Sequence, residues 1–268
     1  MRILGTGLSG TIGKFMAKDV TPINLDLSEN KSAFSNIDFE LNDTLIHLGG
    51  LVGNSLVEKD LTYSQKVNIR GTQFLSEVFK KKSVGKFVYL STSHVYAPSN
   101  MKISENYEVN PISLYGSQKL EAEKILQEIF SSMPDRLLII RLFSVLDWGG
   151  KSHTLSGGIS ELIKKNTSFK LFTVDDTRDF LTPNSAAKVV LMLAKNMNVN
   201  GIVNLCSGES TRVLDAVVRM LSESGFEVPW SNLKNGNSKV PSIVGDPTRI
   251  ENLIHKKLNW SPGKYEIK

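Results

Sequence analysis

Three glycines, each three residues after the last, follow the first short apolar run. Gly7, Gly10 and Gly13 stand in Thr6-Gly7-Leu8-Ser9-Gly10-Thr11-Ile12-Gly13, after the predicted strand Arg2–Gly5. Because glycine has no Cβ, such a turn lets the backbone approach a diphosphate, whose charge is stabilised at the N-terminus of the next helix. The loop therefore predicts a dinucleotide site, the alternative being a glycine turn that only packs closely. The predicted cofactor contacts are Gly7, Gly10, Thr11 and Ile12.

Short β-rich runs alternate with longer helical patterns, which is typical of a parallel sheet with crossover helices. The predicted strands are Arg2–Gly5, Leu45–Gly49, Lys86–Ser91 and Leu137–Leu142. The predicted helices between them are Ile12–Lys18, Asp60–Lys82 and Ser113–Phe130. Apolar residues recur at helical spacing in Asp60–Lys82, so one face is expected to pack on the sheet. The predicted fold class is α/β, with a doubly wound Rossmann-type sheet.

The pattern changes after Phe143. Residues Asp147–Gly158 are rich in glycine and serine and predict a loop. The elements predicted beyond it are helix Ile159–Lys165, strand Lys170–Phe172, helix Asn184–Asn196, strand Gly201–Leu205 and helix Arg212–Glu223. We expect a dinucleotide-binding domain over residues 1–146 with a return around 177–197, and a smaller substrate-binding domain over 147–176 and 198–268.

Composition excludes several classes of protein. The net charge of +5 invites a nucleic-acid partner, but the basic residues form short runs such as Lys80–Lys82, without interleaved aromatics, and indicate solvated helix faces. A single cysteine, Cys206, excludes an internal disulfide and a cysteine metal cluster, and we expect no metal. No apolar stretch approaches eighteen residues and no secretion signal is recognisable, so we expect a cytoplasmic protein without a membrane span.

Tyr115 and Lys119 lie four residues apart, so a helix places them on one face. A phenol with a pKa near 10 is a poor base at neutral pH. Lowering this pKa to about 7 requires the phenolate to be stabilised relative to the phenol by roughly 4 kcal/mol. A nearby ammonium supplies part of this, and the dipole of a helix beginning near Ser113 also favours an anion. Tyr115 is therefore a candidate for exchanging a proton with a substrate hydroxyl. The spacing by itself is a weak signal.

Hydroxyl side chains follow the buried strand that ends at Leu90. They stand in Ser91-Thr92-Ser93-His94, and ligands of open parallel sheets bind at the carboxyl ends of strands. These residues are therefore candidates for the substrate site, the alternative being a Ser/Thr-rich turn.

Together these segments resemble the NAD-dependent epimerase/dehydratase family, the extended short-chain dehydrogenases. The resemblance extends from Met1 to about Pro262. The matching segments are Thr6–Gly13, Ile46–Gly50, Asn68–Thr72, Ser91–Tyr96, Glu105–Lys119, Arg141–Phe143, Arg178–Phe180, Asn204–Glu209 and Leu258–Pro262.

The resemblance implies an enzyme that uses NAD, with NADP possible, on a nucleotide-diphosphate sugar. Thr92 would orient the sugar hydroxyl, Tyr115 would be the acid/base and Lys119 would hold the nicotinamide ribose. Arg178 would contact the substrate phosphates, unless it only pairs with a neighbouring aspartate (Asp175, Asp176 or Asp179). The further implied cofactor contacts are Leu48, Gly49, Gly50, Asn68, Ser91, Tyr115, Lys119 and Leu142. The further implied substrate contacts are Ser93, His94 and Ser144.

The chain departs from the family pattern in two ways. Asp26 lies nineteen residues after Gly7, which suits a ribose-binding carboxylate, but its distance from His47 aligns it with the family's adenine-side acid. The second alignment, which we favour, leaves the usual second strand missing or vestigial and the choice between NAD and NADP open. Ser93 and His94 replace the Asp-Glu pair of the dehydratases, so dehydration is disfavoured.

The remaining reactions are 4-epimerisation and 4-keto reduction, and the alternative is a non-catalytic dinucleotide-binding or sensing protein on the same fold. His94 could be an additional acid/base or a histidine satisfied within the loop. By analogy with the family, a homodimer could form through the helices predicted at Asp60–Lys82 and Ser113–Phe130.

Overall fold

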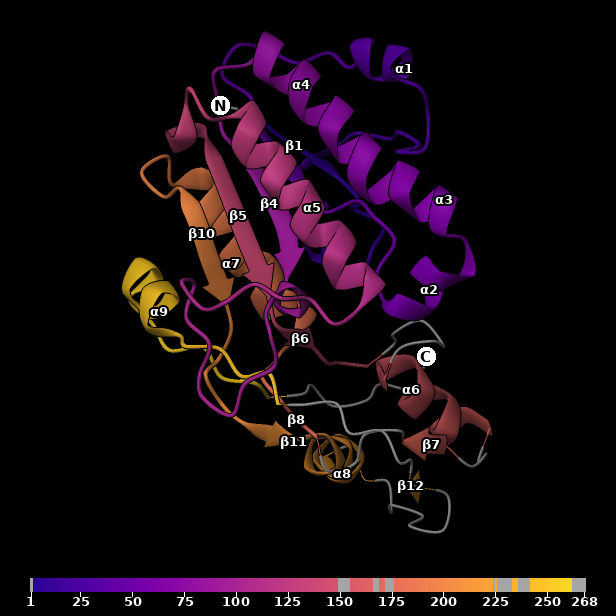
Figure 1. Ribbon diagram of the computed structural model, residues 1–268. Helices are drawn as coiled ribbons and strands as arrows, with labels where there is room; N and C mark the ends of the chain where they lie inside the picture. The colour runs from indigo at the N-terminus through magenta and orange to yellow at the C-terminus, as the bar shows by residue number, and fades with distance from the viewer. Residues whose placement is uncertain are drawn as a thin grey trace. The chain divides into compact units, whose positions relative to one another are not determined.

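The computed structural model describes residues 2–148, 155–165, 169–171, 176–223, 225, 233–235 and 242–261 (Figure 1). The chain divides into two compact units. The first comprises Met1–Ala97, Glu105–Leu142 and Ala186–Leu205, and the second comprises Pro98–Ser104, Phe143–Ser185 and Cys206–Lys268. Residues 198–205, which the sequence-based division assigns to the smaller domain, thus lie in the first unit, and residues 98–104, 143–146 and 177–185 of the predicted dinucleotide-binding domain lie in the second.

The first unit contains a parallel sheet, in which six of the described strands take the order β10-β5-β4-β3-β1-β2. The strands are β1 (Ile3–Thr6), β2 (Thr21–Pro22), β3 (Thr44–His47), β4 (Phe87–Thr92), β5 (Leu137–Leu142) and β10 (Gly201–Leu205). Nearly all residues of β3, β4 and β5 are buried, as expected for strands covered on both faces. The predicted α/β Rossmann-type sheet is confirmed.

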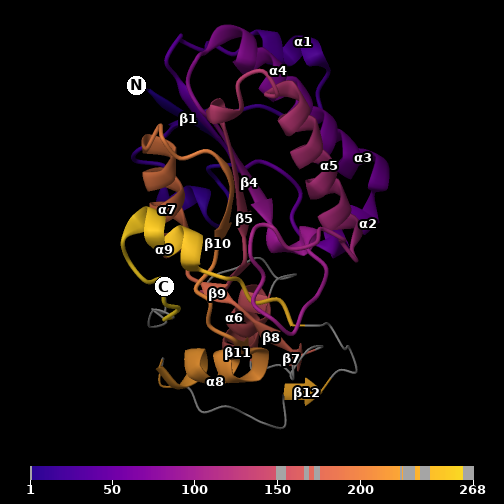
Figure 2. The same ribbon diagram turned by 60° about the vertical axis from the view of Figure 1, so that its left-hand side comes forward.

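Helices cover both faces of this sheet. Figure 2 shows helices α3, α4 and α5 on one face and α7 on the other. Their bounds are α3 (Leu61–Gln65), α4 (Thr72–Lys82), α5 (Leu114–Ile129) and α7 (Pro183–Lys195), and the shorter helices α1 (Lys31–Ser35) and α2 (Asn54–Lys59) belong to the same unit. Phe79, Phe87 and Phe130 are buried between α4, α5 and the sheet, with ring centroids 5.6 Å apart in each neighbouring pair. The helix predicted over Asp60–Lys82 is interrupted by a π-helical turn at Lys66–Gly71.

The helix predicted over Ile12–Lys18 is wrong. The structure has a 3-10 helix of three residues, Gly13–Phe15, in which Phe15 and Met16 donate to the carbonyls three residues earlier. After Gly13 the chain forms turns, such as the one in which Asp19 donates its N–H to the carbonyl of Met16 at 2.9 Å, and it enters β2 at Thr21. The expected contribution of a helix dipole to diphosphate binding is correspondingly lost.

The second strand is vestigial, as the family alignment predicts. β2 consists of Thr21–Pro22, which pair with Leu4 and Gly5 of β1. Among the described residues no further strand pairs with its outer edge. Directly after β2, Ile23 still donates its backbone N–H to the carbonyl of Gly5 at 2.7 Å, and residues 23–26 form no regular element.

Lys86 lies fully buried directly before β4. Its ammonium donates to the carbonyls of Asn196 and Val199, the latter at 2.6 Å, in the segment between α7 and β10. Burial lowers the pKa of Lys86 to about 8. The side chain thus ties two distant parts of the first unit together.

The second unit contains short paired strands and three helices among its described residues. The strand pairs are β6 (Ser144–Val145) with β9 (Phe180–Leu181), β7 (Phe169–Leu171) with β12 (Leu233–Asn235), and β8 (Thr177–Arg178) with β11 (Thr211–Arg212). The helices are α6 (Leu155–Lys165), α8 (Val213–Glu223) and α9 (Thr248–Ile254). The loop predicted through Gly158 is wrong from Leu155 onward, because Gly157 and Gly158 are buried in α6 and packing outweighs their low helix propensity. Phe172, predicted as strand, lies outside the described residues.

Asp179 is a fully buried carboxylate within the second unit. Its Oδ1 accepts the backbone N–H and the hydroxyl of Ser207, both at 2.7 Å. Its Oδ2 accepts the backbone N–H of Gly208 at 2.8 Å and of Gly245 at 3.2 Å. One side chain therefore joins three segments that are far apart in the sequence.

Candidate active site

The glycine loop requires its glycines at Gly7 and Gly13. Gly7 has φ +71°, and a Cβ there would lie 2.7 Å from the backbone nitrogen of Gly49. A Cβ on Gly13 would lie 2.4 Å from the carbonyl oxygen of Gly7. The loops after β1 and β3 can therefore touch because Gly7 has no side chain, and the absence of one at Gly13 lets the glycine loop fold back on itself. Thr11 is exposed and Ile12 is buried, so the two predicted cofactor contacts after Gly10 differ in access.

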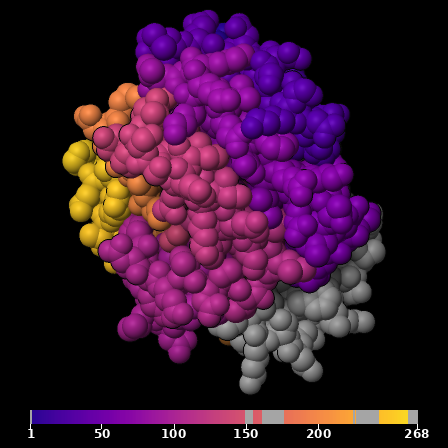
Figure 3. Space-filling model, turned by 45° about the horizontal axis from the view of Figure 1, so that its top comes forward, coloured from indigo at the N-terminus to yellow at the C-terminus, as the bar shows by residue number. Residues whose placement is uncertain are grey.

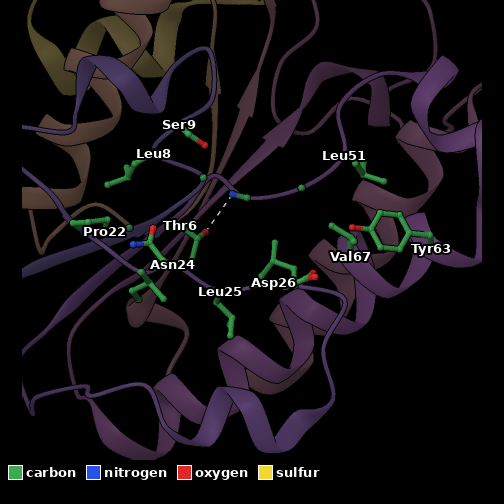
Figure 4. A pocket seen from close by; sticks show the side chains of 16 residues that line it. Thr6, Leu8, Ser9, Pro22, Asn24, Leu25, Asp26, Leu51, Tyr63 and Val67 are labelled. Carbon is green, nitrogen blue, oxygen red and sulfur yellow. Dashed lines mark hydrogen bonds between the residues drawn. The ribbon is translucent and has the colours of Figure 1, made fainter.

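A pocket of about 440 Å³ lies beside this loop (Figure 4). Gly7, Asp26, Gly49 and Gly50 are the predicted cofactor residues among those that line it. Asn24, Leu51, Tyr63 and Val67 line it as well and were not predicted. Apolar walls beside a glycine loop with open backbone suit a nucleotide's base and diphosphate. The remaining predicted cofactor contacts lie outside this lining.

Asp26 is exposed at the pocket. Its Oδ1 accepts the backbone N–H and hydroxyl of Ser28, which lowers the pKa of the carboxyl below its usual value. Asp26 is therefore an ionised acceptor, whichever part of a nucleotide it meets.

Asn68 holds the loop after β3 rather than facing the pocket. Its Oδ1 accepts the N–H of Leu51 at 2.8 Å, and its Nδ2 donates to Gln118 on α5 at 2.9 Å. Gly49 is fixed by an N–H donated to the Thr6 hydroxyl at 3.2 Å, drawn in Figure 4. The described contacts of Asn68 thus position the strand end that contains Leu48, Gly49 and Gly50.

Tyr115 lies in the first turn of α5, as predicted. Ser113 caps this helix by accepting the N–H of Gly116 at 3.1 Å. A Cβ on Gly116 would lie 2.3 Å from the carbonyl oxygen of His94, so this glycine lets the turn after β4 reach the helix start. The rings of His94 and Tyr115 lie edge to face with centroids 6.0 Å apart. Thr92 accepts the N–H of His94 and hydrogen-bonds the Tyr115 side chain.

The pKa of Tyr115 is not lowered toward neutrality as the spacing predicts. Burial raises it to about 12, and the hydrogen bond from Thr92 pulls it down only in part. The ammonium of Lys119 instead donates to the carbonyl of Leu90 at 2.8 Å and lies 4.0 Å from the centre of the Tyr89 ring. In this arrangement Tyr115 is a protonated acid at neutral pH.

A sequence profile decides the family. The profile described as "NAD dependent epimerase/dehydratase family" matches residues 6–206, from the glycine loop to the end of β10. The chain belongs to this family. The resemblance that the sequence motifs indicate is confirmed. The prediction of an NAD(P)-dependent enzyme of the epimerase/dehydratase family is confirmed as well.

Individual known proteins are similar to this chain over most of their length. A GDP-6-deoxy-D-talose 4-dehydrogenase from Aggregatibacter actinomycetemcomitans is 26% identical, covering 95% of this chain and 91% of its own. A GDP-6-deoxy-D-mannose reductase from Pseudomonas aeruginosa is 25% identical, covering 97% and 88%. A solved structure of RMD from Pseudomonas aeruginosa complexed with NADPH has the same fold, with a TM-score of 0.83 at 22% identity over 97% of this chain and 95% of that one.

Ser91, one of the predicted cofactor contacts, hydrogen-bonds a carboxylate on α5. Its hydroxyl donates to Oε1 of Glu123 on α5, and both residues are buried. Arg141 on β5 binds the same carboxylate, with Nη2 2.7 Å from Oε2. Sequence reasoning missed this pair, although Glu123 follows Lys119 at the helical spacing of four. Leu142, a predicted cofactor contact, is half-buried at the end of β5 beside Thr92.

The predicted substrate residues divide between the two units. In the first unit, Thr92 ends β4, and buried Ser93 and exposed His94 follow it. Ser144 begins β6 in the second unit and is half-buried. Arg178, also in the second unit, pairs with Asp176 at 3.2 Å, which is the ion pair considered as the alternative to phosphate binding.

The described residues contain no group of three or more His, Cys, Asp or Glu side chains arranged to hold a metal ion. In the same part of the chain, no helix combines the length and apolar character needed to cross a membrane.

Proposed function

We propose that this protein catalyses NAD(P)-dependent oxidoreduction at a hydroxyl or keto carbon of a nucleotide-linked sugar. The observation that supports it most is the pairing of buried Tyr115 with Thr92 at the carboxyl end of β4. The same sheet presents the glycine loop and its pocket at the end of β1. Relatives named as nucleotide-sugar reductases and epimerases over nearly the whole chain support the substrate class.

Of the two reactions, we place 4-keto reduction first and 4-epimerisation second. When bound, NADH or NADPH supplies the hydride. Thr92 orients the sugar oxygen, and Tyr115, protonated at neutral pH, donates its proton to that oxygen. Solvent then restores the proton on Tyr115. Ser93 and His94 offer no pair of carboxylates, which argues against dehydration.

The test is a panel of UDP-, GDP- and dTDP-linked hexoses and 4-keto-6-deoxyhexoses, each with NADH or NADPH. A reductase oxidises added cofactor in step with loss of the keto sugar. An epimerase keeps its cofactor through purification and interconverts sugars without net change in nicotinamide absorbance. Tight dinucleotide binding with no turnover of any member would instead identify a non-catalytic sensing protein.

Asp26→Ser distinguishes the two roles considered for Asp26. If the carboxylate meets the ribose, loss of its hydrogen bond is expected to cost about 1 kcal/mol, weakening NAD roughly fivefold while NADP binds no worse. If it meets the adenine, both cofactors weaken equally. Calorimetric titration with each cofactor measures this. Asp19→Ser, at an exposed carboxylate outside the pocket, is the control and should leave both affinities unchanged.

A homodimer through α4 and α5 stays a prediction. These helices lie side by side over one face of the sheet (Figures 1 and 2), and Figure 3 shows purple and magenta segments of the first unit at the surface. The exposed positions of α5 include Ser117, Glu121, Lys124 and Glu128. Charged residues are depleted at the centre of stable interfaces, so this surface gives the dimer little support.

A further inference from the structure

His47 is a fully buried histidine at the end of β3, and the proposed reaction does not use it. Each of its two ring nitrogens has a hydroxyl partner: Nδ1 lies 2.6 Å from the hydroxyl of Thr6, and Nε2 lies 3.0 Å from that of Thr72. The ring stacks on Tyr89 of β4, with centroids 5.6 Å apart. An apolar ring would pack here without needing polar partners, so the two hydrogen bonds call for an explanation of their own.

The neighbours of the His47 ring decide which nitrogen carries the proton. Thr72 donates its single hydroxyl proton to the carbonyl of Asn68 at 2.8 Å, so toward Nε2 this hydroxyl can only accept. Nε2 is therefore protonated, and Nδ1 is the bare nitrogen that accepts the hydroxyl proton of Thr6. The oxygen of Thr6 in turn accepts the backbone N–H of Gly49 at 3.2 Å.

The opposite tautomer would leave two groups without partners. With the proton on Nδ1, the hydroxyl of Thr6 would accept twice, and the described residues give its own proton no other acceptor. Thr72 would have to donate to Nε2, and its oxygen would then face the Asn68 carbonyl at 2.8 Å without a proton between them. Burial, with a smaller contribution from the charge of Lys119, lowers the pKa of His47 to about 3, so the ring is neutral at neutral pH.

This directional chain of hydrogen bonds holds the loop after β3 at two points. It begins at the N–H of Gly49 and ends at the carbonyl of Asn68, whose side chain accepts the N–H of Leu51 at 2.8 Å. Thr6, Gly49 and Leu51 all line the pocket beside the glycine loop, and Figure 4 shows the bond between Thr6 and Gly49. Hydrogen bonds that point in one direction polarise and strengthen one another. In this chain His47 is the link that joins β1 to α4.

We propose that His47 is a positioning residue for the dinucleotide, whose bare Nδ1 orients the Thr6 hydroxyl and thereby holds residues 49–51 in the position that binds the cofactor. His47 is not among the residues that line the pocket, so it acts through Thr6. The proposal rests on the proposed function only for the identity of the ligand, NAD or NADP. It does not depend on which sugar reaction follows.

The first test measures the tautomer of His47 in the wild-type protein. Ring nitrogens are observed by ¹⁵N–¹H NMR at neutral pH, and the His47 signals are assigned through nuclear Overhauser contacts with the Tyr89 ring. We expect a protonated Nε2 and an unprotonated Nδ1. A proton on Nδ1, with or without one on Nε2, would overturn the proposal. This readout requires neither cofactor nor turnover.

The second test uses two substitutions that separate hydrogen bonding from packing, with dissociation constants for NAD and NADP measured by calorimetric titration. His47→Phe keeps an aromatic ring against Tyr89 and removes both nitrogens. We expect it to bind dinucleotide about fivefold more weakly, a loss equivalent to one ordinary hydrogen bond. His47→Asn is smaller, but its Oδ1 can replace Nδ1 as the acceptor for Thr6, so its affinity should stay close to that of the wild type.

A role in packing alone predicts the opposite order, with His47→Phe close to the wild type and His47→Asn weaker. That order, an equal loss in both variants or no loss in either would overturn the proposal. Leu193→Ala is the control for lost stability, because Leu193 is buried on α7, on the other face of the sheet (Figure 2). It should lower the Tm and leave both affinities unchanged.

If His47→Phe does not fold, Thr72→Val replaces it. This change removes the acceptor of the Nε2 proton at a residue that does not line the pocket. The form protonated at Nδ1 should then appear in the NMR spectrum and dinucleotide binding should weaken, and an unchanged affinity would overturn the proposal. A wild type that binds dinucleotide but turns over no nucleotide sugar would contradict the proposed function and leave this proposal intact.

Discussion

Tyr115→Phe is expected to lower turnover by about 10²- to 10⁴-fold, the range that general acid–base catalysis supplies. The change removes the proton that the phenol donates and leaves its buried ring in place. Cofactor affinity and Tm should stay close to those of the wild type, so the loss should appear in kcat. Turnover is measured with whichever nucleotide sugar the panel identifies.

Tyr107→Phe is the matched control, because it removes a phenol hydroxyl from a residue outside the proposed catalytic machinery. Its turnover should equal that of the wild type. Turnover in Tyr115→Phe within a few fold of the wild type would show that another group carries the proton, and exposed His94, whose ring contacts Tyr115, would be the first to examine.

Asp179→Ala is expected to destabilise the second unit by at least about 3 kcal/mol. The backbone N–H groups of Ser207, Gly208 and Gly245 would lose their acceptor, and each unsatisfied buried donor costs about 1–3 kcal/mol. Burial raises the pKa of Asp179 and disfavours its charged form, which offsets part of the stabilisation that its hydrogen bonds give the folded protein.

Urea unfolding followed by tryptophan fluorescence measures this effect, since Trp148 and Trp260 belong to the second unit. Asp215→Ala is the control: Asp215 forms an exposed ion pair with Arg212, whose loss should change stability by less than about 1 kcal/mol. Equal midpoints for the two variants would refute the role assigned to Asp179.

The sequence predicted those strands and helix ends whose formation depends on the residues of one short segment. The apolar runs of β4 and β5 and the cap at Ser113 are recognisable in a single segment, and the structure has them where the sequence predicts. The helix at Ile12–Lys18 failed because its periodicity contains no information on how soon the chain must return to the sheet. The loop predicted at Gly157 and Gly158 was wrong for the opposite reason, since burial of these glycines in α6 outweighed their low helix propensity.

The candidate site was predictable by residue type and less so by electrostatics. Spacing and resemblance brought Thr92, Tyr115 and Lys119 together. The sequence did not predict that the pKa of Tyr115 is raised. Burial of the ring depends on the segments that cover it, and the Lys119 ammonium donates to the carbonyl of Leu90. The partnership of Glu123 with Arg141 joins a helix to a strand eighteen residues away, which helical spacing cannot reveal.

The buried ammonium of Lys86 has a consequence for how the protein is made. Its two acceptors, the carbonyls of Asn196 and Val199, are synthesised more than a hundred residues after it, immediately before the edge strand β10. Until that stretch leaves the ribosome, a nascent chain that has assembled β1 to β5 keeps an unpaired cation directly before β4 and an open edge at β5. The sheet is thus completed late in translation, and an incomplete chain that ends before residue 196 presents an edge on which another chain could add.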